Sequence, residues 1–217
     1  MTSPAPRRAV LFDMDDTLLL TREVKWDHHR FVAREHYGIE LDDQTLRAHW
    51  GEPFDEMIGN LYRHSAPVDE MRAVNKACAH RYPKAVVPGA VEVVTSLMDA
   101  GLLVGVVTST NTDMALADLD RCGLPVDRLC LVHGADVTGH HKPDPRVFDR
   151  ALEFLRGLNV TEVTYVGDAV MDDQAAAGAE LGFIAVTTGL FDASRFEGRA
   201  VVDDITDVLP LLLGDRA

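Results

Sequence analysis

The sequence has little cysteine, no long apolar run and no internal repeat. Its three cysteines, Cys78, Cys122 and Cys130, are odd in number and lack CxxC spacing. This usage argues against a disulfide framework, so we expect free thiols in a reducing, cytoplasmic setting. No apolar stretch approaches the ~20 residues that cross a membrane. No apolar segment follows the two arginines within residues 1–8 either, so we expect neither a membrane anchor nor a signal peptide.

Positive charge is also scarce. The chain has 21 Lys and Arg residues against 35 Asp and Glu residues, which gives a formal net charge of −14. Such a surface disfavours nucleic acid and anionic membranes as partners, and an anionic substrate would need a local positive site. The 217 residues, 47% of them hydrophobic, suit one globular unit or a core domain with a smaller insertion.

The N-terminal part of the chain predicts one strand followed by helices. The apolar run at residues 9–13 indicates a buried strand. Between Thr21 and Asp99 there is no convincing strand, and Gly38 and three prolines separate four helical stretches. These stretches cover residues 21–37, 42–49, 54–64 and 68–82. We therefore predict a helical insertion over residues 20–84 in a core made of residues 1–19 and 85–217.

After residue 88 the pattern changes to alternating strands and helices. Strands are expected at residues 102–107, 129–132, 163–166 and 183–186, and helices at residues 91–100, 114–121, 145–155, 172–181 and 208–213. This alternation predicts an α/β fold with a parallel, doubly wound sheet. The carboxyl ends of such strands share one edge of the sheet, so residues far apart in the sequence converge there.

Polar residues end three of the predicted strands, namely Asp13, Thr108 and Asp168. Asp15 follows two residues after the first of them, and Lys142 precedes a proline in a later loop. Each residue taken alone also fits a polar turn or a helix cap. Together, the carboxylates suit a hard cation such as Mg2+. The hydroxyl and the ammonium suit phosphoryl oxygens, and one carboxylate remains to attack the phosphorus.

At these residues the sequence resembles the haloacid dehalogenase superfamily, and within it the helical-cap phosphatases of the phosphoglycolate phosphatase and β-phosphoglucomutase type. The resemblance covers nearly the whole chain and implies a Rossmann-like core with residues 20–84 as an α-helical cap domain. It also implies Mg2+-dependent hydrolysis of a small phosphomonoester through an aspartyl phosphate. The motifs match in order and spacing: Asp13-Met14-Asp15-Asp16-Thr17, Thr108, Lys142-Pro143, and Gly167-Asp168 with Asp172.

The resemblance also implies roles for the catalytic residues. Asp13 would be the nucleophile that becomes the aspartyl phosphate. Asp15 would protonate the leaving group and then deprotonate the attacking water. Thr108, together with Ser109, and Lys142 would hold and neutralise the phosphoryl oxygens of the substrate.

The implied cofactor is Mg2+, bound by Asp13, Asp168 and the backbone carbonyl of Asp15. Asp172 would not bind the ion directly but would hold a water molecule that is bound to it. Asp172 and Asp173 both lie at spacings that the superfamily uses, and we favour Asp172 because paired alanines follow it at residues 175–176.

Two positions depart from the family pattern. The family more often has glycine where Asp16 stands, although aspartate is a familiar variant. It usually has serine or threonine at Ala169, so a minor hydrogen bond is expected to be missing there.

Other activities compete with the hydrolase interpretation. A phosphosugar mutase of the β-phosphoglucomutase type is the main alternative, but known mutases carry a histidine at the position of Lys25. A phosphonate hydrolase would need a reactive cap lysine, and Lys25 keeps this activity as a minor alternative. Hydrolytic dehalogenases lack an aspartate at the position of Asp15. Signalling receiver domains carry similar residues in a different order and have no helical insertion after the first strand.

The expected substrate is a small phosphorylated metabolite, which the sequence does not identify. In similar proteins the cap selects it, here through Arg22, Lys25, His28 and His29 and through a loop that contains Glu52. Adjacent side chains do not face the same way on a helix or strand, so His28-His29 and His140-His141 are not expected to bind a metal. The oligomeric state is left open between monomer and homodimer.

Overall fold

The structure, a computed structural model, describes residues 7–50, 52 and 54–214. The chain forms two compact units. One contains the residues up to Leu20 and those from Ala85 onward, and the other is Thr21–Lys84. We call them the α/β unit and the helical unit and describe each by itself. Within the described ranges, none of the helices combines the length and apolar character needed to cross a bilayer.

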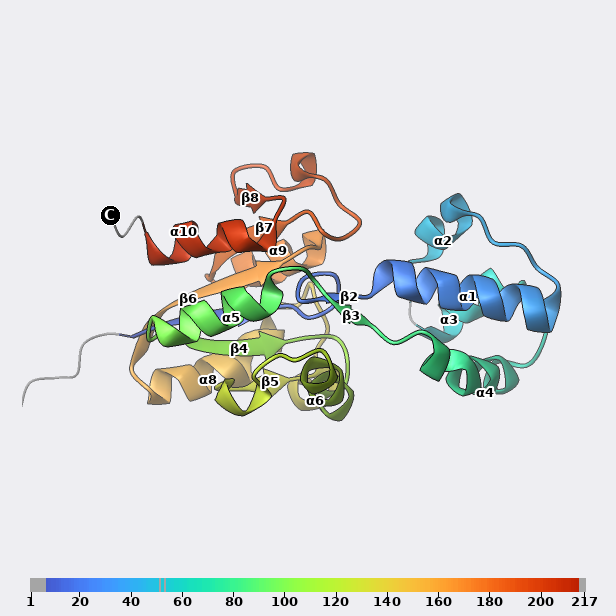
Figure 1. Cartoon of the computed structure of the whole chain (residues 1–217), viewed down its shortest axis with the longest axis horizontal. Coiled ribbons are helices and arrows are strands. Elements are labelled where there is room, and N and C mark those ends of the chain that lie inside the picture. Colours follow the sequence, from blue (N-terminus) through green and yellow to red (C-terminus); the bar gives the residue numbers. More distant parts are fainter. Residues whose placement is uncertain (1–6, 51, 53, 215–217) are drawn as a thin grey trace, which may run out of the picture. The chain divides into compact units, whose positions relative to one another are not determined.

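A six-stranded sheet in which all neighbouring strands are parallel forms the centre of the α/β unit (Figure 1). Its spatial order is β5-β4-β1-β6-β7-β8, so the first strand of the chain lies in the middle. The strands are β1 (Arg7–Phe12), β4 (Leu103–Val107), β5 (Val132–His133), β6 (Val160–Gly167), β7 (Gly182–Val186) and β8 (Ala200–Val202). The predicted α/β class with a doubly wound parallel sheet is therefore confirmed.

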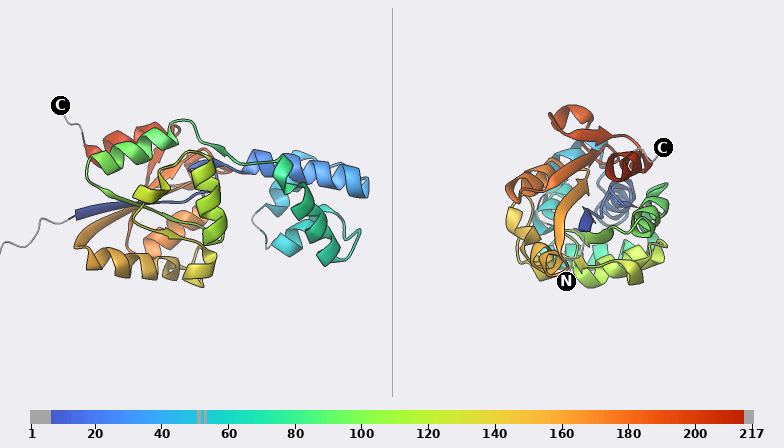
Figure 2. Two further views of the ribbon diagram at one scale, coloured as in Figure 1. Left: turned by 60° about the horizontal axis from the view of Figure 1, so that its bottom comes forward. Right: turned by 90° about the vertical axis from the view of Figure 1, so that its left-hand side faces the viewer.

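From Ala9 to Phe12, strand β1 is apolar and buried, because helices cover both faces of the sheet there, whereas Arg7 and Arg8 at its start are exposed. Its side chains alternate, as the twofold period of a strand requires. Val10 and Phe12 join a core cluster with α5 (Ala90–Asp99), α6 (Thr112–Arg121) and α10 (Val208–Leu213). Ala9 and Leu11 join a second cluster with α8 (Asp149–Gly157) and α9 (Val170–Gly178). Figure 2 shows α5 and α10 side by side over one face and α8 beneath the other.

The strand order fixes where a site can form. Later strands are added outward from β1 on both sides: β4 and then β5 on one side, and β6, β7 and β8 on the other. Next to such a switch point, the loops that follow neighbouring parallel strands diverge and leave space for side chains. The ladder continues slightly past the strands, because the Asp13 N–H donates to the Val166 carbonyl at 2.8 Å and the Thr108 N–H donates to the His133 carbonyl at 3.0 Å. Asp13, Thr108 and Asp168 therefore all follow strands at the same edge of the sheet.

Several element boundaries differ from the predicted ones. The expected helix at residues 145–155 begins as a 3₁₀ turn (Pro145–Phe148) and continues as α8. Of the strand expected at residues 129–132, only Val132 belongs to β5, although Cys130 and Leu131 also share backbone hydrogen bonds with β4. Four short strands and helices were missed: the antiparallel pair β2 (Leu19–Leu20) and β3 (Ala85–Val86), the edge strand β8, and the helix α7 (Ala135–Thr138). Elements of two to four residues are too short to show a periodic pattern.

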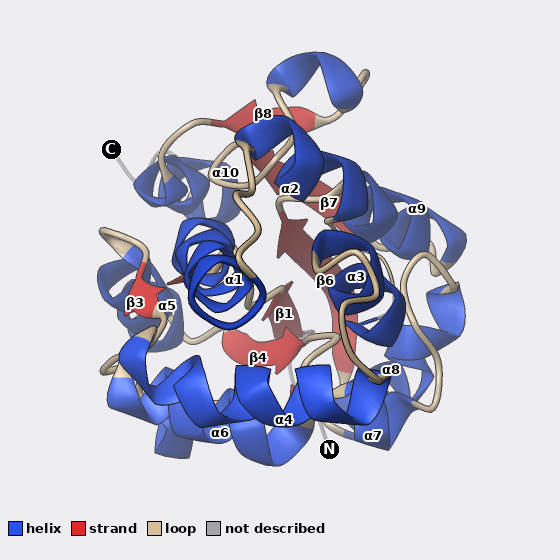
Figure 3. Cartoon of the chain, turned by 90° about the vertical axis from the view of Figure 1, so that its right-hand side faces the viewer, coloured by secondary structure: helices blue, strands red, loops and turns tan. Residues whose placement is uncertain are grey.

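The helical unit contains α1 (Arg22–Tyr37), α2 (Asp43–His49), α3 (Phe54–Leu61) and α4 (Val68–Cys78) (Figure 3). Gly38 ends α1 as predicted, with a left-handed φ of 66° and its N–H on the last carbonyls of the helix. Asp42 caps α2 by accepting from the Thr45 N–H at 2.7 Å. Helix α3 ends earlier than predicted, because Arg63 and His64 both have φ of 51°.

A buried polar network joins α1 and α4 through Tyr62, the residue that follows α3. The Nδ1 atom of His29 lies 2.7 Å from the Tyr62 hydroxyl, which donates to Oδ1 of Asn75 at 2.9 Å. The Asn75 amide in turn donates to the Met71 carbonyl at 2.8 Å, which fixes its orientation. The Tyr62 hydroxyl has one proton, which it donates to Asn75. His29 must therefore be the neutral tautomer that donates from Nδ1 to the Tyr62 oxygen.

His28 and His29 are only 4% and 3% exposed. The suggestion that they face a ligand from the first cap helix is therefore corrected: they pack in the interior of the helical unit. Burial lowers the pKa of His29 to about 3, with smaller contributions from the charges of His28 and Lys25. Burial likewise lowers the pKa of His28 to about 4. Both rings are neutral in the folded protein at neutral pH.

The helical unit should therefore lose stability in mild acid. A folded pKa below the unfolded value of about 6.5 means that the unfolded chain takes up the proton first as pH falls. For each buried histidine, the free energy of unfolding then falls by about 1.4 kcal/mol per pH unit below the unfolded pKa. The measurement is the difference in Tm between wild type and His29→Gln. We expect the Tm of wild type, relative to that of the variant, to fall by about 4 °C or more between pH 7 and pH 5. The exposed His80→Gln is the control, and a constant difference for His29→Gln would contradict the assignment.

Candidate active site

Four charged side chains from three separate segments meet at the carboxyl edge of the sheet. Asp13 follows β1, Asp168 follows β6, Asp172 lies in the first turn of α9, and Lys142 comes from the loop before the 3₁₀ turn. One carboxylate oxygen from each of the three aspartates lies within 4.8 Å of the others, and all three residues are buried. The Lys142 ammonium lies 2.5 Å from Oδ1 of Asp13 and 2.7 Å from Oδ1 of Asp172.

The charges of this cluster do not balance. Burial is the largest cause that raises the pKa of Asp13, to about 7, and Asp172 and Asp15 add to it while Lys142 opposes it. Burial also raises the pKa of Asp168 well above its usual range, and the charges of Asp13 and Asp172 reinforce that rise. One ammonium is not enough for three buried carboxylates. The cluster therefore favours an additional positive charge.

Lys142 remains charged in this setting. Burial alone would lower its pKa, but the charges of Asp13 and Asp172 raise it well above the usual value. The ammonium also lies 5.1 Å from the ring centre of Tyr165, a cation–π contact. The Tyr165 hydroxyl donates to the Val107 carbonyl at 2.8 Å, which anchors the ring beneath the lysine. Tyr165 was not predicted, because nothing distinguishes it from other apolar positions of its strand.

Thr108 and Asp15 are joined through a residue that the sequence analysis missed. Thr108 is buried just beyond β4, and its hydroxyl oxygen accepts from the Thr110 N–H at 3.1 Å. The Thr110 hydroxyl donates to Oδ2 of Asp15 at 2.9 Å. Asp15 is half-buried and Ser109 is exposed. The Asp15 carboxylate is thus held by a threonine from the neighbouring loop and does not belong to the three-carboxylate cluster.

Asp172 and Asp173 point to different partners. Both oxygens of Asp172 are engaged, one by Lys142 and the other by the Ala169 N–H at 3.0 Å. Asp173 instead lies 2.7 Å from the guanidinium of Arg199. The structure therefore places Asp172, and not Asp173, in the cluster. Ala169 has no side-chain cap to offer, so Asp172 satisfies its N–H from the third position of the helix.

Asp16 explains one of the departures from the family pattern. Its φ is 60°, in the left-handed region that glycine adopts most easily and that Asp and Asn tolerate better than other residues. A glycine in related sequences would meet the same backbone requirement, and aspartate is the next acceptable choice.

The two predicted specificity residues lie in the helical unit. Lys25 is a half-buried residue of α1. Glu52 accepts from Asn60 at 2.9 Å and lies 3.0 Å from Nδ1 of His49, and these two contacts lower the pKa of its carboxyl. The unit thus holds Glu52 as an oriented anion.

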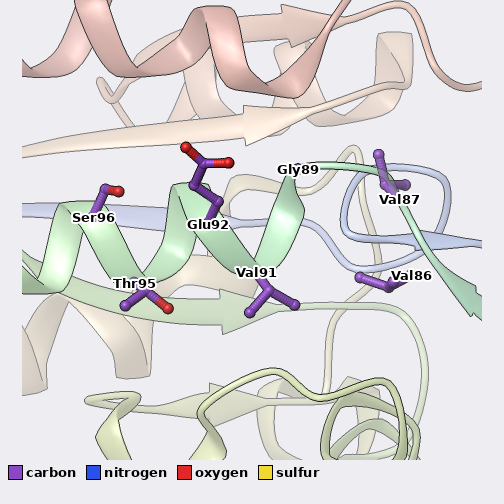
Figure 4. A pocket seen from close by; sticks show the side chains of 7 residues that line it. All are labelled: Val86, Val87, Gly89, Val91, Glu92, Thr95 and Ser96. Carbon is purple, nitrogen blue, oxygen red and sulfur yellow. The ribbon is translucent and has the colours of Figure 1, made fainter.

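A cavity of about 520 Å³ lies along the start of α5, lined by Val86, Val87, Gly89, Val91, Glu92, Thr95 and Ser96 (Figure 4). This lining offers one carboxylate and two hydroxyls, and none of these residues is cationic. It does not contain any residue of the carboxylate cluster. A phosphorylated ligand is therefore better matched by the strand-end cluster than by this cavity.

The donor set of the cluster fits Mg2+. This ion takes oxygen ligands at about 2.1 Å, so two ligating oxygens are at most about 4.2 Å apart. The 4.8 Å span of the three aspartates needs only a small contraction to meet that limit. Lys142 contacts one oxygen of Asp172 and the Ala169 N–H donates to the other. Among the described residues, Asp13 and Asp168 each accept a hydrogen bond at one oxygen only, so Asp172 is the least available direct ligand of the three.

Comparisons with known proteins agree with this geometry. Residues 10–186 match the family model described as haloacid dehalogenase-like hydrolase. The chain is 29% identical over 208 residues to validoxylamine A 7′-phosphate phosphatase of Streptomyces hygroscopicus subsp. limoneus, covering 93% of this chain and 95% of that one. It is 26% identical over 221 residues to phosphoglycolate phosphatase of Chromobacterium violaceum, covering 94% and 96%.

A solved structure also shares the fold. A candidate β-phosphoglucomutase from Thermotoga maritima superimposes with a TM-score of 0.81 at 24% identity, covering 95% of this chain and 98% of that one. The family match spans most of the chain and includes Asp13, Thr108, Lys142 and Asp168. The chain is therefore a member of the haloacid dehalogenase-like hydrolase family.

Proposed function

We propose that this protein is a Mg2+-dependent phosphatase that hydrolyses a small phosphomonoester through an aspartyl phosphate on Asp13. The observation that carries the proposal is the buried group of Asp13, Asp168 and Asp172 with Lys142 2.5 Å from Asp13. Phosphoryl transfer of this kind requires a nucleophilic carboxylate, a site for a cation and an ammonium group that is held in place. Phosphatases among the similar proteins support the same class of reaction.

In the proposed reaction, an Asp13 carboxylate oxygen forms a bond to phosphorus while the bond from phosphorus to the leaving oxygen breaks. Asp15 gives its proton to that leaving oxygen and takes one from the water that later attacks the aspartyl phosphate. Water attack releases inorganic phosphate and restores the Asp13 carboxylate. Thr110 orients Asp15 for both proton transfers through its 2.9 Å hydrogen bond.

The ammonium of Lys142 and the Thr108 hydroxyl would neutralise and orient the phosphoryl oxygens. Asp13 and Asp168, with the backbone carbonyl of Asp15, would hold Mg2+, and Asp172 would support it from outside. The ion supplies positive charge to the phosphoryl group and offsets the repulsion among the aspartates. We further propose a cytoplasmic enzyme, monomeric or homodimeric, whose partner is a small phosphorylated metabolite.

A phosphate-release screen over a panel of metabolite phosphates tests this function. We expect Mg2+-dependent release from at least one small sugar or organic-acid phosphate, and loss of release in EDTA. Conversion of a sugar phosphate to its isomer without phosphate release would instead support a mutase. No release from any member of the panel, with Mg2+ present and with a small aryl phosphate included, would contradict the proposal.

We also propose that Thr21–Lys84 is the cap that selects the substrate. Lys25→Ala and Glu52→Gln should each change the order of preferred substrates by about tenfold or more in relative kcat/KM. The rate with a small aryl phosphate should change less, because that substrate lacks the group being recognised. Exposed Glu56→Gln in α3 is a control for general effects on the unit. An unchanged preference order in both variants would remove these residues from the specificity site.

A further inference from the structure

The loop after β7 is fixed to the neighbouring strand end. The Thr187 N–H donates to the Val202 carbonyl at 3.0 Å, which extends the pairing of β7 with β8. The Thr187 hydroxyl donates to Oδ1 of Asp203 at 2.6 Å. The backbone of this loop is therefore held from the outer side of the sheet.

The next residue ties the loop to the segment that carries the nucleophile. The Thr188 hydroxyl donates a short hydrogen bond to the backbone carbonyl of Asp16. Asp16 has a left-handed φ of 60° and lies one residue after Asp15. A hydrogen bond at this carbonyl connects the loop after β7 to the turn between Asp13 and Thr17.

Gly189 lies directly against the carboxylate of Asp168. A Cβ atom at Gly189 would be 1.8 Å from Oδ2 of Asp168 and 2.6 Å from its Cγ. The φ of Gly189 is not positive, so the position needs glycine for space and not for conformation. On its other oxygen, Asp168 accepts from the Thr17 hydroxyl at 3.2 Å. The Asp168 carboxylate thus has the Thr17 hydroxyl at one oxygen and the Gly189 backbone at the other.

We propose that Thr188 and Gly189 are positioning residues for the Mg2+ site, a proposal that rests on the proposed function. The bare backbone at Gly189 leaves room for Asp168 to lie beside Asp13 and Asp172, and Thr188 holds that backbone in place. A methyl group at residue 189 would force the Asp168 side chain to turn away from the other two carboxylates. The metal affinity then falls although every ligand is still present.

Gly189→Ala tests the proposal through Mg2+ binding to the intact protein. We expect its Tm in EDTA to stay near that of wild type, because the added methyl displaces one side chain and not the sheet. The Mg2+ concentration that gives half of the maximal rise in Tm should increase by at least about tenfold. Gly157→Ala is the matched control, since a Cβ built there meets no atom within 4 Å beyond its chain neighbours and its own helix backbone, and its φ is not positive. A Gly189→Ala protein with the wild-type Mg2+ response would overturn the proposal.

A second pair of variants covers the case in which Gly189→Ala does not fold. Thr188→Ala removes the hydrogen bond to Asp16 and should raise the required Mg2+ concentration severalfold, while Thr188→Ser keeps the hydroxyl and should restore the wild-type value. Equal Mg2+ responses in these two variants would also overturn the proposal. Failure of the proposed function gives a different result: wild type itself would show no Mg2+-induced rise in Tm.

Discussion

Asp13→Asn should fold normally and lose at least about a thousandfold of phosphatase activity. The amide is a poor nucleophile and a weak metal ligand, so one substitution removes both covalent catalysis and part of the cation site. The fold should persist, because asparagine keeps the shape and an oxygen that accepts from Lys142, and Lys142 also keeps Asp172 at 2.7 Å. The measurement is kcat/KM with an aryl phosphate at saturating Mg2+, together with a thermal melt.

Asp173→Asn is the matched control for this result. It removes a carboxylate in the same stretch of chain as Asp172, but one that pairs with Arg199 outside the cluster. We expect this variant to retain most of its activity. Activity of Asp13→Asn within tenfold of wild type would refute the assignment of Asp13 as the nucleophile.

The second large effect concerns the metal. The folded pKa of Asp168 is raised above its ordinary value by burial and by the neighbouring carboxylates. A raised carboxyl pKa means that repulsion is absent at low pH and grows as pH rises above the unfolded value of about 3.9. The protein without a cation is thus destabilised at neutral pH. Mg2+ at about a hundred times its dissociation constant should add roughly 2.7 kcal/mol, or about 5 to 10 °C in Tm.

Asp168→Asn removes one repelling charge and one ligand at once. We expect its Tm in EDTA at pH 7.5 to equal or exceed that of wild type, while most of the Mg2+-induced rise and most of the activity are lost. Thermal melts of wild type, Asp168→Asn and Asp173→Asn, each with EDTA and with Mg2+, make the comparison. A variant that melts well below wild type in EDTA, or that keeps the full Mg2+ response, would show that Asp168 is structural.

Much of this architecture follows from short-range patterns in the sequence. The apolar run before Asp13 predicts a buried strand because a central strand covered on both faces has no polar side. Asp13, Thr108 and Asp168 each end a predicted strand. Their convergence is predictable because a parallel sheet places all such strand ends at one edge. Lys142 is recognised only through the family motif, because a lysine before a proline is usually just a loop residue.

The remaining parts of the site depend on tertiary contacts that no local pattern contains. Thr110 reaches Asp15 across 95 positions of sequence, and Tyr165 supports Lys142 from the buried end of β6. Gly189 is one of 16 glycines, and its role is visible only when the Asp168 carboxylate is found against it. The choice of Asp172 over Asp173, in contrast, rests on the paired alanines of the family pattern, and the contact of Asp172 with Lys142 agrees with it.

The most direct test of the central claim is to trap the phosphorylated nucleophile. Wild type is mixed with substrate and Mg2+, quenched in acid during turnover and reduced with borohydride, which converts an aspartyl phosphate to homoserine. Peptide mass spectrometry then reads the residue at each position. We predict homoserine at residue 13 in wild type and none in Asp13→Asn. Efficient phosphate release with an unmodified Asp13, or with homoserine at residue 15 or 168 instead, would contradict the account.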